Sequence, residues 1–156
     1  MIRAAFDRLE EMLAAVLVTA MCAVVALQVF CRLVLRSPLS WSEELATILF
    51  VWVTMIGASL ALKRGEHFAV ELLRGVLPPA ARRATGALVG LLLAVFSLIL
   101  LVKGLEMAWR NIPVRTPAME IPRALPYAAV PAGGALMLVR SLQLVWRRAR
   151  GEGEAR

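Results

Sequence analysis

Four long apolar stretches, separated by charged or proline-containing segments, constrain this chain more than any other feature. The first, residues 12–31, holds 20 residues without a charge, and a helix of about that length crosses a hydrocarbon core about 30 Å thick. Comparable stretches follow at 41–62, 84–102 and 125–146. Because 60% of the 156 residues are hydrophobic, the composition is too apolar for an ordinary soluble domain. The sequence therefore predicts a single all-α integral membrane domain with four transmembrane helices.

A secretory signal peptide is the main alternative for the first stretch, since such peptides also place arginines before an apolar core. The core here is longer than that of a typical signal peptide. Gln28, Phe30 and Arg32 do not form a cleavage site of small residues. We therefore interpret residues 12–31 as a retained helix.

The second stretch begins with a polar segment that carries two adjacent carboxylates. Ser40 and Glu43 fit the S-x-x-E capping box, which predicts that the helix begins at Trp41. An indole at that position suits the water interface. Glu43 thus has a structural task, whereas Glu44 lies in line with small residues and is the better candidate for contact with a partner subunit.

The connection between the second and third stretches is basic and amphipathic. Phe68, Leu72 and Val76 recur at i, i+4 and i+8, which predicts a short interfacial helix over about 66–77. His67 lies at its start, where a solvated side chain is more usual than a proton relay. After the fourth stretch, residues 150–156 are expected to be disordered.

The third and fourth stretches contain small residues and one charge. Gly86 and Gly90 have the G-x-x-x-G spacing that lets another helix approach closely, although glycine is also simply common in membrane helices. Pro131, with the glycine pair after it, is expected to bend the fourth helix. Arg140 lies near one end, so we expect its side chain to snorkel to the interface.

The lysines and arginines predict the orientation. With both termini in the cytoplasm, 12 of the 18 lie inside and 6 outside, a bias that supports this arrangement. The inside residues are Arg3, Arg8, Lys63, Arg64, Arg74, Arg82, Arg83, Arg140, Arg147, Arg148, Arg150 and Arg156. Those outside are Arg32, Arg36, Lys103, Arg110, Arg115 and Arg123.

The expected spans offer little for catalysis or for independent transport. None has an acidic residue at its centre, where a coupling ion would be held. One histidine and two cysteines do not provide a zinc ligand set. The basic residues also lack the interleaved aromatics of a nucleic-acid surface. We therefore expect no catalytic residue, metal, cofactor or nucleic-acid partner.

Two segments of the sequence resemble a known family. PLSWSEELATILFVWVTMIGASLALKRGEHFAVELL and TPAMEIPRALPYAAVPAGGALMLVR are similar to the small membrane subunit of tripartite ATP-independent periplasmic (TRAP) transporters, the DctQ-type family. The likeness extends over about residues 12–146. It implies a bacterial inner-membrane protein that scaffolds a large multi-span subunit and contributes to docking a periplasmic solute-binding protein. The resemblance also implies ion-driven, sodium-coupled uptake of an organic acid, with the subunit in contact with membrane lipid.

From this resemblance we expect a set of polar and small residues to contact the partner subunits. They are Trp41, Ser42, Glu43, Glu44, Thr47, Gly57, Gly65, Glu66, His67, Gly86 and Gly90. Two alternatives remain open, namely a self-sufficient four-helix transporter or exporter and a membrane enzyme. A lipid-binding or structural protein is a third, which rests only on the amphipathic segment.

Overall fold

The computed structural model describes residues 2–64 and 79–149 and forms four long helices in those ranges. The helices are α1 (Ile2–Leu33), α2 (Ser40–Arg64), α4 (Pro79–Arg110) and α5 (Ala124–Ala149). Each contains a segment that is long and apolar enough to cross a membrane, namely Arg8–Leu33, Ser40–Leu62, Leu88–Arg110 and Ala124–Gln143. The predicted all-α membrane fold is confirmed. The expected interfacial helix at 66–77, the tail at 150–156, and Gly65, Glu66 and His67 lie outside the described residues.

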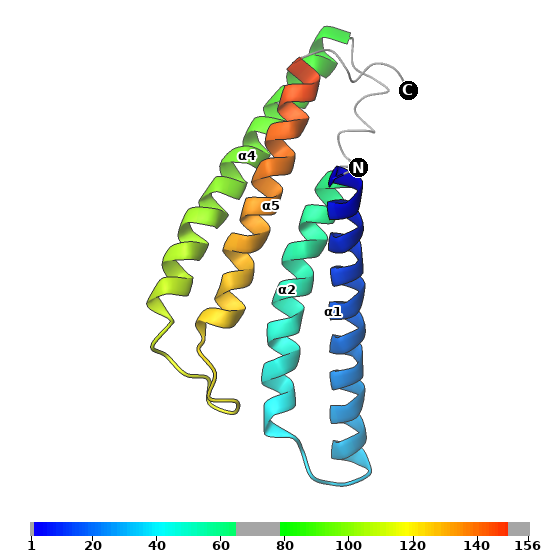
Figure 1. The fold of residues 1–156 in the computed structure, drawn as a ribbon, viewed down its shortest axis with the longest axis vertical. Helices are drawn as coiled ribbons and strands as arrows, with labels where there is room; N and C mark the ends of the chain where they lie inside the picture. Colours follow the sequence, from blue (N-terminus) through cyan, green and yellow to red (C-terminus); the bar gives the residue numbers. More distant parts are fainter. Residues whose placement is uncertain (1, 65–78, 150–156) are drawn as a thin grey trace.

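The four helices lie side by side in the order α4, α5, α2, α1 (Figure 1). Helices that follow one another in sequence run in opposite directions, so the neighbours α5 and α2 run in the same direction (Figure 1). α5 packs against both α4 and α2, while α2 also packs against α1. The connections 34–39 and 111–123 lie at the same end of the bundle, which we call the hairpin end (Figure 1). The order in space therefore differs from the order in sequence, because the last helix inserts between α2 and α4.

α4 continues beyond residue 102, where the sequence predicted the third span to end. Lys103 and Arg110 both pair with Glu106, at 3.0 and 2.6 Å and at i,i+3 and i,i+4 spacing. Such pairs stabilise a helix. The first proline after them is Pro113. The charges therefore belong to the last turns of α4 and not to the following loop.

Glycines bring α5 close to its two neighbours. A Cβ on Gly133 would lie 2.7 Å from Cβ of Met55 in α2, and one on Gly134 would lie 2.8 Å from the backbone nitrogen of Leu101 in α4. A Cβ on Gly104 of α4 would likewise lie 2.7 Å from Cδ of Pro131 in α5. The glycine pair that we expected to help bend α5 thus lets two helix backbones approach it.

α1 contacts the bundle along one narrow stripe. Between Arg8 and Leu33, the residues that are not exposed are Glu10, Ala14, Leu17, Ala20, Met21, Val24, Gln28 and Cys31. Apart from Ala20, they follow one another at alternating steps of four and three, the spacing of a coiled-coil seam. No residue in the most apolar 18-residue window of α1 is buried. α1 is therefore the most peripheral of the four helices.

Candidate partner-binding surface

The first turn of α2 differs from the predicted capping box. The helix begins at Ser40, one residue earlier than predicted. Among the described residues, Ser40 and Glu43 do not exchange the two bonds of a capping box. Instead, Oε1 of Glu43 accepts a hydrogen bond from the Gln28 amide at 3.0 Å. The prediction was wrong because a side chain on α1, distant in sequence, reaches this carboxylate.

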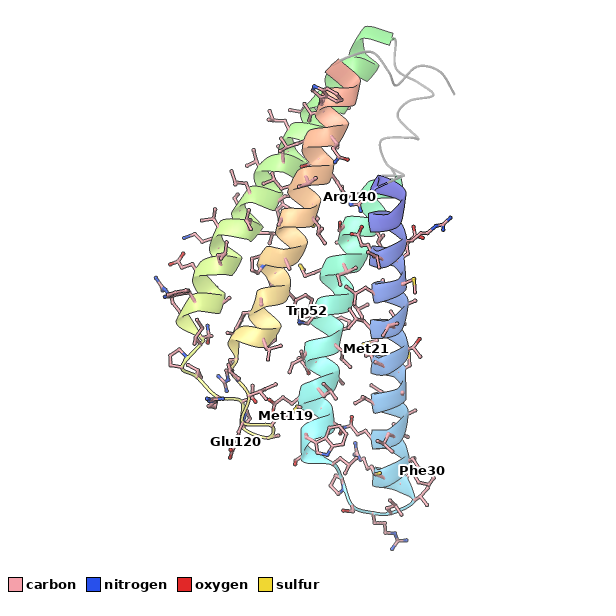
Figure 2. All side chains as sticks on the ribbon, in the orientation of Figure 1. Met21, Phe30, Trp52, Met119, Glu120 and Arg140 are labelled. Atoms are coloured by element: carbon pink, nitrogen blue, oxygen red, sulfur yellow. The ribbon has the colours of Figure 1, made fainter. Side chains whose placement is uncertain are left out.

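Glu44 binds the connection between α4 and α5. Its Oε2 accepts hydrogen bonds from the backbone N–H groups of Ala118 and Met119, at 2.9 and 3.2 Å. Consecutive N–H groups in a turn form a concave site for an anion. Figure 2 shows Met119 and Glu120 beside the start of α2. The carboxylate that we expected to face a partner subunit therefore holds a loop of its own chain.

The loop 111–123 satisfies much of its own backbone. Thr116 N–H donates to Ile121 O at 2.9 Å, and Arg123 N–H donates to Val114 O at 2.8 Å. The Arg115 guanidinium donates to the carbonyl of Glu120 at 3.1 Å, and Glu120 has a positive φ of 53°. These bonds let an irregular segment lie beside a membrane helix, where unpaired backbone groups are unfavourable.

Trp52 forms a hydrogen bond that shows how far the loop 111–123 extends along α2. Its indole N–H donates to the carbonyl of Leu125 at 3.3 Å, and Figure 2 places the ring between α2 and α5. Trp52 is 12 residues after Ser40, or about 18 Å along a helix. The start of α5 is therefore level with the middle of α2, and the loop occupies the space alongside the first turns of α2.

One face of α2 remains uncovered, and we call it the α2 strip. It consists of Glu43, Thr47, Phe50, Thr54, Gly57 and Ala61. A Cβ on Gly57 would meet no atom within 4 Å. The Thr47 and Thr54 hydroxyls donate to carbonyls of their own helix, both at 2.8 Å, as is usual for threonine within a helix. Apart from Glu43 and Phe50, the strip presents small side chains whose hydroxyls are already bonded, so another helix can pack closely onto it.

The structure separates the expected partner contacts into two groups. Trp41, Glu43, Thr47 and Gly57 remain accessible on α2. The other described residues are used inside the chain. They are Ser42, whose hydroxyl donates to Leu39 O at 2.7 Å, Glu44 in the loop contact, buried Gly86, and Gly90, which faces Val145 of α5.

A buried polar cluster lies at the end of the bundle opposite the hairpin end. Arg140 of α5 pairs with Oε2 of Glu10 in α1, and its Nε donates to Oγ of Ser59 in α2 at 3.1 Å. The Arg140 and Glu10 side chains are only 13% and 4% exposed. Arg140 therefore does not snorkel as predicted, since a carboxylate and a hydroxyl bind it within the bundle (Figure 2).

The sequence contained a signal for this cluster. A lone arginine in an otherwise uncharged membrane helix requires a polar partner. The four-and-three spacing of the α1 stripe, extended backwards, includes Glu10. Glu10 lies near the end of its span and is paired with Arg140, which differs from the unpaired midplane acid that a carrier uses.

Comparison with known proteins gives a consistent result. The family model described as "Tripartite ATP-independent periplasmic transporters, DctQ component" matches residues 21–151. The Sialic acid TRAP transporter small permease protein SiaQ of Vibrio cholerae is 29% identical over 146 residues, which cover 94% of this chain and 84% of that protein. The C4-dicarboxylate TRAP transporter small permease protein DctQ of the same species is 28% identical, over 94% of this chain and 73% of that protein.

A longer relative also matches. The Sialic acid TRAP transporter permease protein SiaT of Haemophilus influenzae is 33% identical over 138 residues, which cover 88% of this chain. The matched segment spans only 22% of the length of SiaT. A segment similar to this chain is thus part of a much longer polypeptide in that species.

Proposed function

Because this chain belongs to the DctQ component family of tripartite ATP-independent periplasmic transporters, we propose that it is the small membrane subunit of an ion-driven solute importer. The observation that carries this proposal is the family match over residues 21–151, which includes most of the helical bundle. The subunit has a scaffolding task and no enzymatic activity. The family resemblance expected from the sequence is confirmed by the same match.

The proposed main partner is a large multi-span membrane subunit. The length of SiaT supports it, since a segment like this chain is there joined to a much longer one. We assign the contact to the α2 strip, with the accessible Trp41 beside it. The small residues Thr47 and Gly57 of the strip allow a helix of the partner to approach α2 closely.

Family membership supports our proposal for the remaining features of the transporter. The proposed location is the bacterial inner membrane, with lipid around the exposed faces of α1 and α4. A periplasmic solute-binding protein delivers the solute, and sodium is the proposed coupling ion. Sialic acid and C4-dicarboxylates, named for the relatives, both carry carboxylates, so an organic acid is the proposed solute class.

Deletion and co-purification test this function. Loss of the chain should abolish solute uptake, and the tagged chain should recover a large multi-span protein from detergent extracts. Gly57→Leu should weaken that association at least about fivefold, because an extra side chain in a close helix contact costs about 1–3 kcal/mol. The matched control is Ala23→Leu, which enlarges an exposed small residue on α1.

Two results would contradict the proposal. Solute transport by the purified chain alone in liposomes would indicate a self-sufficient transporter. Equal losses of the partner in Gly57→Leu and Ala23→Leu would remove the α2 strip as the contact surface while leaving the subunit function intact.

A further inference from the structure

The contact stripe of α1 carries a polar residue near each of its ends, and these two residues suggest a role that the scaffold function does not require. Glu10 pairs with Arg140, and Gln28 donates to Glu43. We propose that these two polar contacts fix the register of α1 along the bundle. Glu10 and Gln28 thus act as positioning residues for the whole first helix.

The two contacts are well placed to define a register. Glu10 and Gln28 are 18 residues apart on the same stripe, or about 27 Å along the helix. One lies near each end of the candidate span. Two fixed points so far apart define both the position of a helix along its axis and its rotation about that axis.

The apolar part of the stripe specifies the register poorly. Between the polar ends it contains Ala14, Leu17, Met21 and Val24, and Figure 2 shows Met21 on the side of α1 that faces α2. Lipid tails are as apolar as these side chains, so no hydrophobic force favours one helix alignment strongly. A shift by one turn would exchange one set of apolar contacts for another.

The Glu10 contact penalises such a shift much more. A one-turn displacement would move the Glu10 carboxylate away from Arg140 and leave a buried charge without its counterion. Ser59 accepts from Nε of the same guanidinium, at 3.1 Å, so the arginine is itself oriented by α2. The contact consequently joins three helices, and α1 otherwise packs on α2.

The Glu10 carboxylate carries a further sign of specificity. Its Oε1 is buried and has no hydrogen-bond partner among the described residues. A buried pair with incomplete hydrogen bonding contributes little to stability. Polar residues in helix seams are best known for selecting one alignment over others. The incomplete bonding therefore favours a role in register over a role in stability.

Cysteine cross-linking in the full-length chain tests the proposal. In a background with Cys22→Ala and Cys31→Ala, the reporter pair is Gln28→Cys with Glu43→Cys, whose native side chains touch. A short bifunctional thiol reagent is applied to native membranes. Because this reporter removes the contact at the hairpin end, the alignment of α1 depends on Glu10 and Arg140 alone.

We expect Glu10→Gln to lower the ratio of cross-linked to free chain at least about tenfold, since the variant removes the charged contact whose loss penalises every other register. The exchange of Glu10→Arg with Arg140→Glu should restore cross-linking. The matched control is Arg8→Gln, which changes an exposed charge near the same end of α1 and should have no effect. Unchanged cross-linking in Glu10→Gln, or no recovery in the exchange variant, would overturn the proposal.

Reporters one turn away distinguish a shifted register from a failure to fold. Glu43→Cys is combined with Val24→Cys in one chain. In a second chain it is combined with Cys31, which is then left unreplaced. In the Glu10→Gln background, one of these products should rise as the original product falls. Loss of the original product without a gain at either neighbouring position would contradict a role in register, because it indicates general unfolding.

Discussion

At the scale of single residues, Glu44 binds a loop of its own chain, although we expected it to contact a partner subunit. Its neighbours along α2 suggested a contact with a partner subunit. In the structure its Oε2 accepts two backbone hydrogen bonds from the loop 111–123. The partner can therefore depend on Glu44 through the shape of this loop, without touching the carboxylate.

Replacing Glu44 with alanine should release the loop. Oε2 of Glu44 accepts both loop N–H groups, so without it the amides of Ala118 and Met119 should exchange hydrogen at least roughly tenfold faster. Hydrogen–deuterium exchange measured by mass spectrometry on peptides from the loop checks this. Glu43→Ala is the matched control, because Glu43 bonds to Gln28 instead.

Similar exchange in the two variants would mean that the loop holds its shape by its internal bonds alone. The bonds of Thr116 with Ile121 and of Arg123 with Val114 would then suffice. Weaker binding of the large subunit in Glu44→Ala, together with fast exchange, would support the indirect role.

Local sequence patterns predicted local bonds well and long-range bonds poorly. The hydroxyls of Thr47 and Thr54 bond their own helix, as their position in an apolar span suggested. The capping box did not form, because Gln28 competes for Glu43 across the α1–α2 contact. The partner of Arg140 is 130 residues away, beyond the range of any local pattern.

At the scale of helices, length and hydropathy predicted the number and approximate position of the spans. They failed at the end of α4, where ion pairs of Glu106 with Lys103 and Arg110 continue the helix through its charged turns. They also could not show that α5 inserts between α2 and α4. That order depends on the glycines of α5, each of which faces a different helix.

Gly134 should tolerate substitution poorly, since the backbone of α4 lies against it. Gly134→Ala places a Cβ 2.8 Å from the Leu101 nitrogen, and overpacking of this kind costs about 1–3 kcal/mol. Unfolding of the purified protein by a denaturing detergent measures the loss.

Gly57→Ala provides the matched control, because its Cβ meets no atom within 4 Å. We expect this variant to be as stable as the original chain or slightly more so, by about 0.5–1 kcal/mol, since alanine favours a helix over glycine. Equal destabilisation of both variants would show that backbone freedom, and not the α4–α5 contact, explains the effect at Gly134.

At the scale of the whole molecule, the bundle has two ends of different character. The hairpin end carries both described connections, and the opposite end carries the start of α1 and the end of α5 (Figure 1). The excess of lysine and arginine supports our proposal that this opposite end faces the cytoplasm. In that orientation, the hairpin end, with Glu44 and its loop, would lie on the periplasmic side.

Labelling with a membrane-impermeant maleimide should report this orientation. In a chain with both native cysteines replaced, Arg36→Cys in the connection 34–39 should react from the periplasmic side of spheroplasts. Glu154→Cys should react only after the membrane is opened. The reverse pattern would contradict the proposed orientation without affecting the fold.

The pairing of Glu10 with Arg140 also has a consequence for biosynthesis. The two residues are 130 positions apart, so at a ribosomal rate of about 5–20 residues per second, roughly 7 to 26 seconds pass between their synthesis. A first helix that enters the membrane during this interval does so before Arg140 is available to its Glu10 carboxylate. Glu10 lies near one end of its span, where water can solvate the carboxylate in place of Arg140 until the last helix is synthesised.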